Sequence, residues 1–195
     1  KMSKSKFNVI NPDDVVERYG ADTFRMYEMF LGPIEQSKPW DMQGIDGVYK
    51  FIRRFISLFY KNDQFSVSEE KATGDELKIL HKTIKKVNDD IGRFSFNTCI
   101  SAFMVCTNEL KKINCNKREI LEPLNSLLAP FAPYTTEEIH DLLNKQSNSI
   151  HLGTYPVHND KYLQEDAFDY PICFNGKKRG VHSFASNLST KEIEE

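Results

Sequence analysis

The amino-acid sequence predicts a mainly α protein: an antiparallel helical bundle with a short polar loop before it and a short β-hairpin after it. Three observations lead to this prediction. Apolar residues recur at three- and four-residue steps from Ile45 to Leu143, which is typical of amphipathic helices. Prolines and glycines divide that pattern into separate segments. Asn175-Gly176 then lies between two apolar runs, and this dipeptide favours a tight hairpin turn.

The composition is that of a folded globular protein. Of 195 residues, 39% are hydrophobic and 28% are charged, which excludes a mostly disordered chain. The net charge is −2, so contact with nucleic acid would require a local basic cluster. No apolar run reaches the roughly 18 residues that span a bilayer, and we expect no membrane partner. The four cysteines lack zinc-site spacing, so we predict no metal site and reduced thiols.

The first forty residues predict a loop followed by helix. Residues 1–10 are polar. In "NPDD", Asn11 can cap a helix and Pro12 suits its first position. The apolar pattern continues to Phe30 and stops at Gly32-Pro33, and Gly20 can divide this span into two helices.

Four or five antiparallel helices on one core are predicted to follow. Their apolar repeats cover residues 45–60, 77–91, 96–113, 120–128 and 139–143. Residues 61–74 are polar and predict a loop. The "TTEE" at 135–138 offers a threonine cap with carboxylates in the first turn. The single tryptophan, Trp40, is interpreted as a packing residue.

The pattern changes after residue 165. Short apolar runs on both sides of Asn175-Gly176 predict a hairpin. "SNLSTKEIEE" at the end has the features of a capped helix. We expect these residues to begin another domain, because an isolated hairpin is only marginally stable in water.

The opening pentapeptide "KMSKS" places two ammonium groups and two hydroxyls on a short loop. Compact cations and hydroxyls suit a polyphosphate whose charge shifts during a reaction. On composition alone, a solvated basic tail is the more common explanation of such a terminus. The residues that follow decide between the two.

"KMSKSKFNVINPDDVVERYGADTFRMYEMFLGPIEQSKPW" resembles the signature segment of the class I aminoacyl-tRNA synthetases, and within them the leucyl-tRNA synthetases. The methionyl, valyl and isoleucyl families share the loop and the "YGAD" pattern, whereas "MFLGPIEQSKPW" resembles the leucyl family. "RFSFNTCISAFM" and "LLAPFAPYTTEEI" are similar to the bundle that this family uses on tRNA. "FNGKKRG" at 174–180 is similar to the turn that opens its small C-terminal domain.

This resemblance implies that Lys1, Met2, Ser3, Lys4 and Ser5 form the loop that closes over ATP. Lys4 would be catalytic, because it would stabilise charge on the departing pyrophosphate when leucine attacks the α-phosphorus. Lys1 would support it electrostatically. The β- and γ-phosphates gain negative charge in the transition state, so a cation placed there lowers the barrier selectively.

The resemblance also implies a domain organisation and an activity. Residues 1–40 would hold the KMSKS loop and linking helix, 41–165 the tRNA-binding bundle, and 166–195 the start of a C-terminal α/β domain. The whole enzyme would use ATP with Mg²⁺ to charge tRNA(Leu) with leucine, as a cytoplasmic monomer. The family's HIGH motif is absent from these residues. We therefore expect a C-terminal portion that is inactive alone and binds no cofactor by itself.

Lys50, Arg53 and Arg54 lie on the polar face of the predicted helix 45–60 and are the candidate tRNA contacts, in competition with a simple solvated face. The lysines at 82, 85, 86, 111 and 112 are weaker candidates, for which a solvated face is the favoured interpretation. Two other functions remain open at this point. One is a methionyl, isoleucyl or valyl enzyme, against which Trp40 and "FNGKKRG" argue. The other is a free-standing helical module that binds tRNA or protein and carries KMSKS by chance.

Overall fold

The computed structural model describes Ser3, Ser5 and residues 9–38, 40–145, 148–164, 167–175 and 177–185. The chain divides into two compact units, residues 1–158 and 159–195, and each is described by itself. Within the described ranges, no helix combines the length and the hydropathy needed to cross a bilayer.

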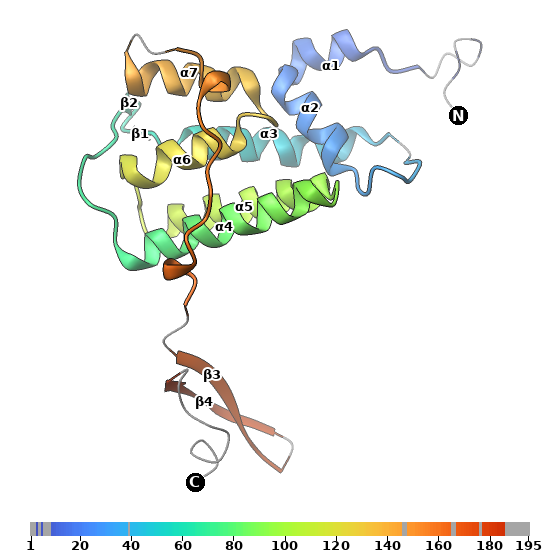
Figure 1. The fold of residues 1–195 in the computed structure, drawn as a ribbon. Coiled ribbons are helices and arrows are strands. Elements are labelled where there is room, and N and C mark those ends of the chain that lie inside the picture. Colours follow the sequence, from blue (N-terminus) through green and yellow to red (C-terminus); the bar gives the residue numbers. More distant parts are fainter. Residues whose placement is uncertain are drawn as a thin grey trace. The chain divides into compact units, whose positions relative to one another are not determined.

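Residues 12–30 form two short helices, as predicted (Figure 1). Helix α1 covers Pro12–Tyr19, and the Asn11 side chain caps it by accepting the backbone N–H of Asp13 at 3.3 Å. Helix α2 covers Ala21–Phe30. Gly20 separates them with φ of +87°, a left-handed conformation that glycine adopts without steric cost.

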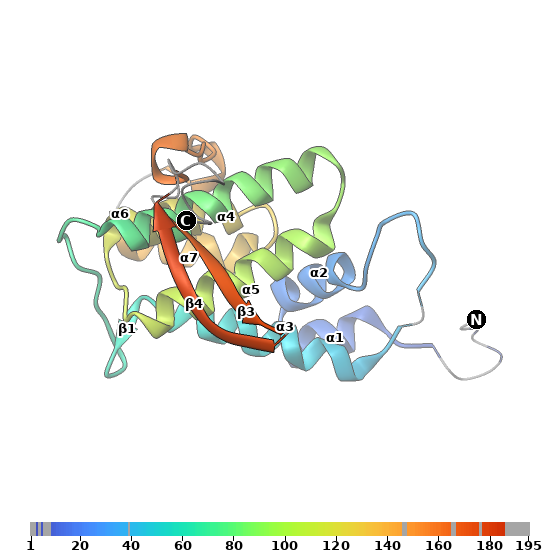
Figure 2. The ribbon, with the colours of Figure 1, turned by 90° about the horizontal axis from the view of Figure 1, so that it is seen from below.

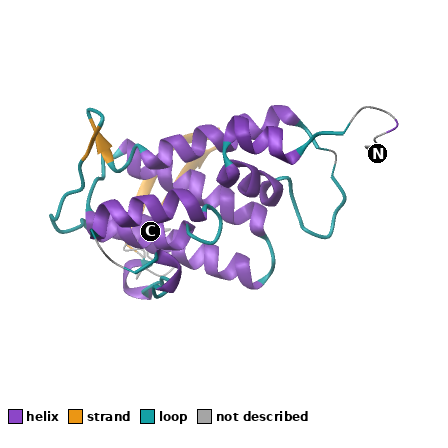
Figure 3. Ribbon diagram, turned by 90° about the horizontal axis from the view of Figure 1, so that it is seen from above, coloured by secondary structure: helices purple, strands orange, loops and turns teal. Residues whose placement is uncertain are grey.

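The predicted bundle is confirmed. Its helices are α3 (Met42–Ile56), α4 (Gly74–Gly92), α5 (Phe96–Lys112), α6 (Arg118–Leu128) and α7 (Pro133–Asn144). Helices α4 and α5 run side by side (Figures 1 and 2), and the short connection between them makes the pair antiparallel. Helices make up most of the described part of residues 1–158 (Figure 3).

One hydrophobic core joins the bundle to the helices before it. Fully buried side chains of the bundle include Phe55, Phe59, Leu80, Ile84, Ile100, Phe103, Leu110, Ile120, Leu121 and Leu124. Val15 of α1 and Met26 and Tyr27 of α2 belong to the same cluster. Trp40 packs edge-on against Tyr27, with ring centroids 5.1 Å apart, which confirms its packing role. Apolar contacts therefore hold helices α1 and α2 against the bundle.

Three of the four cysteines are packing residues. Cys99, Cys106 and Cys115 are buried free thiols. Burial raises the pKa of Cys106 to about 12 and those of Cys99 and Cys115 to about 11. They are therefore protonated, unreactive core groups at neutral pH.

The predicted helix over 45–60 and loop over 61–74 are each partly wrong. Helix α3 begins earlier, because Asp41 caps it through the N–H of Gln43 at 2.9 Å, and it ends at Ile56. The chain then forms a small hairpin in which β1 (Tyr60–Lys61) pairs with β2 (Gln64–Phe65). The turn residues Asn62 and Asp63 have φ of +51° and +59°, the conformation of a type I′ turn, which Asn and Asp tolerate.

The predicted threonine cap of the last helix is also wrong. Helix α7 begins at Pro133, and neither threonine caps it. The cap comes instead from α2: the buried Asp22 carboxylate accepts the backbone N–H groups of Tyr134, at 3.3 Å, and Thr135, at 2.6 Å. A partner so distant in sequence satisfies donors that a local side chain would otherwise satisfy.

The second unit contains the predicted hairpin. Strand β3 (Ala167–Phe174) pairs antiparallel with β4 (Lys177–Ala185), with Phe174 opposite Lys177. Asn175 in the turn has φ of +50°, as a primed turn requires. The helix predicted within "SNLSTKEIEE" lies outside the described residues.

Candidate nucleic-acid interface

The KMSKS stretch is described only at its serines. The Ser3 and Ser5 hydroxyl oxygens are 2.7 Å apart and share a hydrogen bond. The two hydroxyls are therefore close enough to contact the same ligand. Lys1, Met2 and Lys4 lie outside the described residues.

The three predicted cations of α3 are exposed on its polar face. Lys50 makes no hydrogen bond or ion pair with any described residue, so its ammonium group is available to a ligand. Arg54 donates from Nη1 to Oδ1 of Asn108 on α5 at 2.5 Å. A guanidinium has five N–H donors, and this bond orients the group while leaving others for a ligand.

Arg53 belongs to a mixed series of cations and aromatic rings. Its guanidinium lies 5.8 Å from the centroid of the Tyr49 ring. Tyr49 meets Tyr19 edge to face, with centroids 5.8 Å apart and an interplanar angle of 77°. Arg18 lies 5.0 Å from the centroid of Tyr19. Each distance is within the range of a cation–π or edge-to-face contact, and the series joins the end of α1 to α3.

Positive charge also gathers at the C-terminal end of α3. Lys111 of α5 donates to the Ser57 carbonyl at 3.0 Å and to the Ser57 hydroxyl at 2.7 Å. Cations stabilise this end of a helix because its carbonyls carry partial negative charge. Arg53 and Arg54 lie in the last turn of α3 and contribute in the same way. These residues therefore support the helix end as well as offering positive charge to an anion.

Three of these residues, Lys50, Arg53 and Arg54, are predicted from the sequence, and Tyr49, Tyr19 and Asn108 are not. Tyr49 and Arg53 are four apart, so their contact could have been read from helical spacing. Tyr19 and Asn108 come from other helices, and no local signal indicates them. Lys111 is one of the weaker sequence candidates, and its contact with Ser57 depends on the packing of α5 against α3. Together the residues can hold phosphate groups through ammonium and guanidinium donors and can stack partly exposed rings against sugars or bases.

No group of three or more His, Cys, Asp or Glu side chains with the geometry of a metal site occurs among the described residues.

Two family models match the chain. The model described as the anticodon-binding domain of tRNA ligase matches residues 76–194, which is more than half of the chain. The model described as tRNA synthetases class I (I, L, M and V) matches residues 1–41. The second match covers the opening pentapeptide and the helices α1 and α2.

Two curated proteins that are similar to the chain are named leucine–tRNA ligase. The protein from Bacteroides thetaiotaomicron is 56% identical over 195 residues, which is all of this chain and 21% of that protein. The protein from Cytophaga hutchinsonii is 54% identical over 196 aligned residues, with the same two shares. The chain thus spans about a fifth of the length of the curated relatives it matches.

A solved structure is similar over the whole chain. It is the ternary complex of Agrobacterium radiobacter K84 agnB2 LeuRS, tRNA and LeuAMS, with a TM-score of 0.75 and 28% identity. The match covers 100% of this chain and 26% of that one. The mainly helical fold with its antiparallel hairpin is therefore one that a tRNA-bound synthetase also has.

Proposed function

Because this chain belongs to the anticodon-binding domain family of tRNA ligases, we propose that it forms the KMSKS loop and the tRNA-binding bundle of a leucine–tRNA ligase. The observation that carries the proposal is the identity of 56% and 54% to leucine–tRNA ligases along the entire chain. That likeness favours the leucyl assignment over a methionyl, isoleucyl or valyl enzyme and over a free-standing module.

Three segments would have separate tasks. Residues 1–40 are the KMSKS loop and linking helices of the catalytic region, 41–165 are the tRNA-binding bundle, and 166–195 begin a C-terminal α/β domain. The end of the class I match at residue 41 and the start of α3 at Met42 support the first boundary.

The catalytic contribution lies in the opening loop. Lys4 stabilises the pyrophosphate that leaves when leucine attacks ATP, Lys1 adds to the positive potential, and Met2, Ser3 and Ser5 complete the ATP loop. The paired hydroxyls of Ser3 and Ser5 support this arrangement, because neighbouring hydroxyls can donate to oxygens of one phosphate chain. ATP with Mg²⁺ and leucine are substrates of the whole enzyme.

Lys50, Arg53 and Arg54 contact the phosphate backbone of tRNA(Leu). Their exposure on one face of α3 supports this, as does the fixed orientation of Arg54. Contacts to phosphates position a nucleic acid and carry little sequence information. These residues therefore contribute affinity and register, while the choice of tRNA depends on other contacts.

The 195 residues by themselves would form no leucyl-adenylate and hold no cofactor, because the chain corresponds to about a fifth of its relatives and contains no HIGH motif. The whole enzyme would act as a monomer in the cytoplasm.

A chimera tests the proposal. The matching residues of the Bacteroides thetaiotaomicron leucine–tRNA ligase are replaced by this chain, and charging of tRNA(Leu) is measured. We expect a folded chimera to charge tRNA(Leu) with leucine. A folded chimera that charges no tRNA(Leu) would overturn the assignment.

A variant of the chimera tests the role of the loop. Lys4→Ala should lower leucine-dependent exchange of pyrophosphate into ATP by roughly 10²–10³-fold, the typical cost of losing one transition-state donor. Lys6→Ala, just outside the pentapeptide, is the matched control and should change exchange little. Equal activity of the two variants would remove Lys4 from the mechanism.

A further inference from the structure

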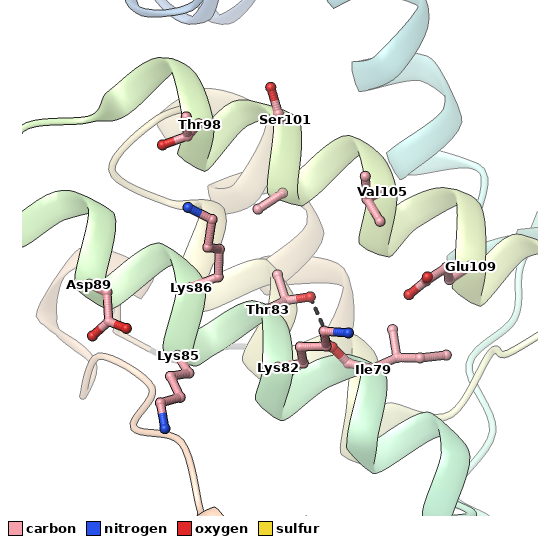
Figure 4. Close-up of a pocket in the computed structure, with 11 residues that line it drawn as sticks. Ile79, Lys82, Thr83, Lys85, Lys86, Asp89, Thr98, Ser101, Val105 and Glu109 are labelled. Carbon is pink, nitrogen blue, oxygen red and sulfur yellow. Dashed lines mark hydrogen bonds between the residues drawn. The ribbon is translucent and has the colours of Figure 1, made fainter. Parts of the chain in front are cut away.

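The outer surface formed by α4 and α5 carries a groove that the proposed function does not use. It encloses about 590 Å³. Figure 4 shows the residues that line it, projecting from the two neighbouring helices. A second hollow of about 350 Å³ adjoins it and shares Ile79, Lys82 and Glu109 with it. The two hollows form one continuous groove along the helix pair.

The floor of this groove is apolar. Val105 on α5 is 56% exposed, and it lies beside Ala102 of the same helix and Ile79 of α4. Ile113, in the adjoining hollow, is 44% exposed. Single exposed apolar residues are common on proteins, but several along one groove mark an interaction surface.

The edge of the groove on α4 is basic. Lys78, Lys82 and Lys86 follow one another at four-residue steps, and Lys85 lies beside them. Lys86 bonds to Asp90 at 2.5 Å, yet half of its side chain is exposed. Lys82 has neither a hydrogen-bond nor an ion-pair partner among the residues that the structure describes. A row of this kind attracts an anionic partner.

We propose that this groove docks an acidic amphipathic helix of a partner protein. The space between two antiparallel helices accepts the side-chain ridge of a third helix. From Asp75 to Asp89 the lining extends over fourteen residue steps of α4, which is about 21 Å at 1.5 Å per step. A docked helix of about four turns would place its apolar face on Val105 and its carboxylates against Lys82 and Lys86.

Charge and side-chain type favour this partner over RNA. Glu109 lies on the α5 side of the groove, where Lys112 also lines it, and Asp89 lies near one end. Both carboxylates would repel a phosphate backbone. Among the described residues, neither hollow has an aromatic ring in its lining, whereas proteins that bind single strands stack bases on such rings. An amphipathic helix can present carboxylates to one edge only, so it fits both the apolar floor and the lysine row.

A fluorescent peptide tests the proposal directly. The probe is an 18-residue peptide with Leu at helical i, i+3, i+4 and i+7 spacing, Glu along one side of that apolar face and Gln at the other positions. Its anisotropy is followed on titration with the full 195-residue chain. Three competitors are compared: the same composition in scrambled order, the peptide with Lys in place of Glu, and an 18-nucleotide single-stranded RNA. We expect saturable binding of the acidic peptide and at least tenfold weaker competition from the other three.

Two pairs of variants place the binding in the groove. Val105→Glu should raise the dissociation constant of the acidic peptide at least tenfold, and Lys82→Glu at least threefold. The controls Val157→Glu, at an aliphatic residue that is 75% exposed outside the groove, and Lys71→Glu should leave it unchanged. Circular dichroism checks that each variant is folded. Absence of binding, equal binding of the scrambled or basic peptide, preference for RNA, or indifference to both groove variants would overturn the proposal.

Discussion

The carboxylate of Asp22 accepts the backbone N–H of Thr135 at 2.6 Å and so joins α2 to the first turn of α7. Asp22 is buried, and it also accepts the N–H of Tyr134. A helix begins with N–H groups that have no partner inside the helix, and here a side chain 113 positions away supplies one. The contact holds the segment after the KMSKS loop against the end of the bundle.

Replacing this cap should destabilise the protein. We expect Asp22→Ala to lower the free energy of unfolding by about 1–2 kcal/mol, because helix caps of this type have that effect. Urea denaturation followed by circular dichroism measures the change. Asp14→Ala, in the exposed first turn of α1, is the control and should cost less. A loss no larger than that of the control would mean that the cap contributes nothing.

A second buried carboxylate predicts a dependence of stability on pH. Asp90 is 1% exposed and accepts hydrogen bonds from Lys86 at 2.5 Å, Arg93 at 2.7 Å and Thr98 at 2.5 Å. Burial by itself would raise the pKa of Asp90, but the bonds from these partners outweigh it and the pKa lies below its ordinary value. A carboxyl lowered in this way stabilises the fold above its unfolded pKa of about 4.

We therefore expect Asp90→Asn to lower the free energy of unfolding by about 1–3 kcal/mol at pH 7. The loss should lie towards the lower end of this range, because solvent screens the exposed Lys86 and Arg93 side chains. The cost should shrink as the pH falls below about 4 and the native carboxyl is protonated. Urea denaturation at several pH values measures it, with the exposed neighbour Asp89→Asn as control. A loss of unfolding free energy that does not change with pH would contradict a stabilising role of the ionised Asp90 carboxylate.

The buried thiols predict a pattern of chemical reactivity. Burial raises the pKa of Cys106 to about 12 and keeps Cys99 and Cys115 protonated, whereas Cys173 is exposed. At pH 8 we expect Ellman's reagent to modify Cys173 rapidly and the other three thiols only after denaturation in guanidinium. Cys173→Ser should abolish the rapid phase. Rapid reaction of any second thiol in the native protein would show that the core opens.

Much of the fold could be predicted because its signals are local. In α5, the spacing of Cys99, Phe103, Cys106 and Leu110 marks one buried face, and each of them is buried. The Asn11 cap and the Gly20 break were equally readable. The hairpin at Asn62-Asp63 does not follow from the sequence in the same way, because Asn-Asp is a weaker turn signal than Asn-Gly, although Asp also tolerates a positive φ.

Contacts between helices could not be predicted in the same way. The Arg54–Asn108 bond joins residues 54 positions apart, and it depends on how α3 and α5 pack. Lys111 was interpreted as part of a solvated face, yet it binds Ser57 at the end of α3. The i,i+4 spacing of Tyr49 and Arg53 was visible, but the role of Tyr49 appears only when Tyr19 is brought beside it. A single sequence contains no record of such pairings.

The aromatic pair between α1 and α3 predicts a measurable coupling. A double-mutant cycle of Tyr19→Leu and Tyr49→Leu should give a coupling free energy of about 0.5–1.5 kcal/mol for the edge-to-face contact. The coupling free energy is obtained from urea denaturation of the parent protein, the two single variants and the double variant. The cycle of Tyr49→Leu with Tyr134→Leu is the control, since Tyr134 is 70% exposed on another helix, and its coupling should be close to zero. Equal coupling free energies in the two cycles would show that Tyr19 and Tyr49 do not interact directly.

The cations of α3 predict how binding of tRNA(Leu) to this chain depends on salt. Each phosphate contact releases counterions, so the slope of log K against log[salt] should fall in magnitude by about 1 for each contact removed. We expect Lys50→Ala and Arg54→Ala each to reduce the slope by about that amount and Lys71→Ala to leave it unchanged. Fluorescence anisotropy of labelled tRNA(Leu) between low and moderate salt gives the slopes.

Arg54 needs one more control because it also bonds to Asn108. Asn108→Ala removes the bond and keeps the charge. If Arg54 binds phosphate, Asn108→Ala should weaken binding through lost orientation while the salt slope stays close to that of the parent protein. If Arg54 only supports the packing of α3 on α5, Arg54→Ala and Asn108→Ala should lower the free energy of unfolding by similar amounts. Neither variant should then change the salt slope of tRNA binding. The slope therefore separates an electrostatic contact from a structural one, a distinction that affinity alone does not make.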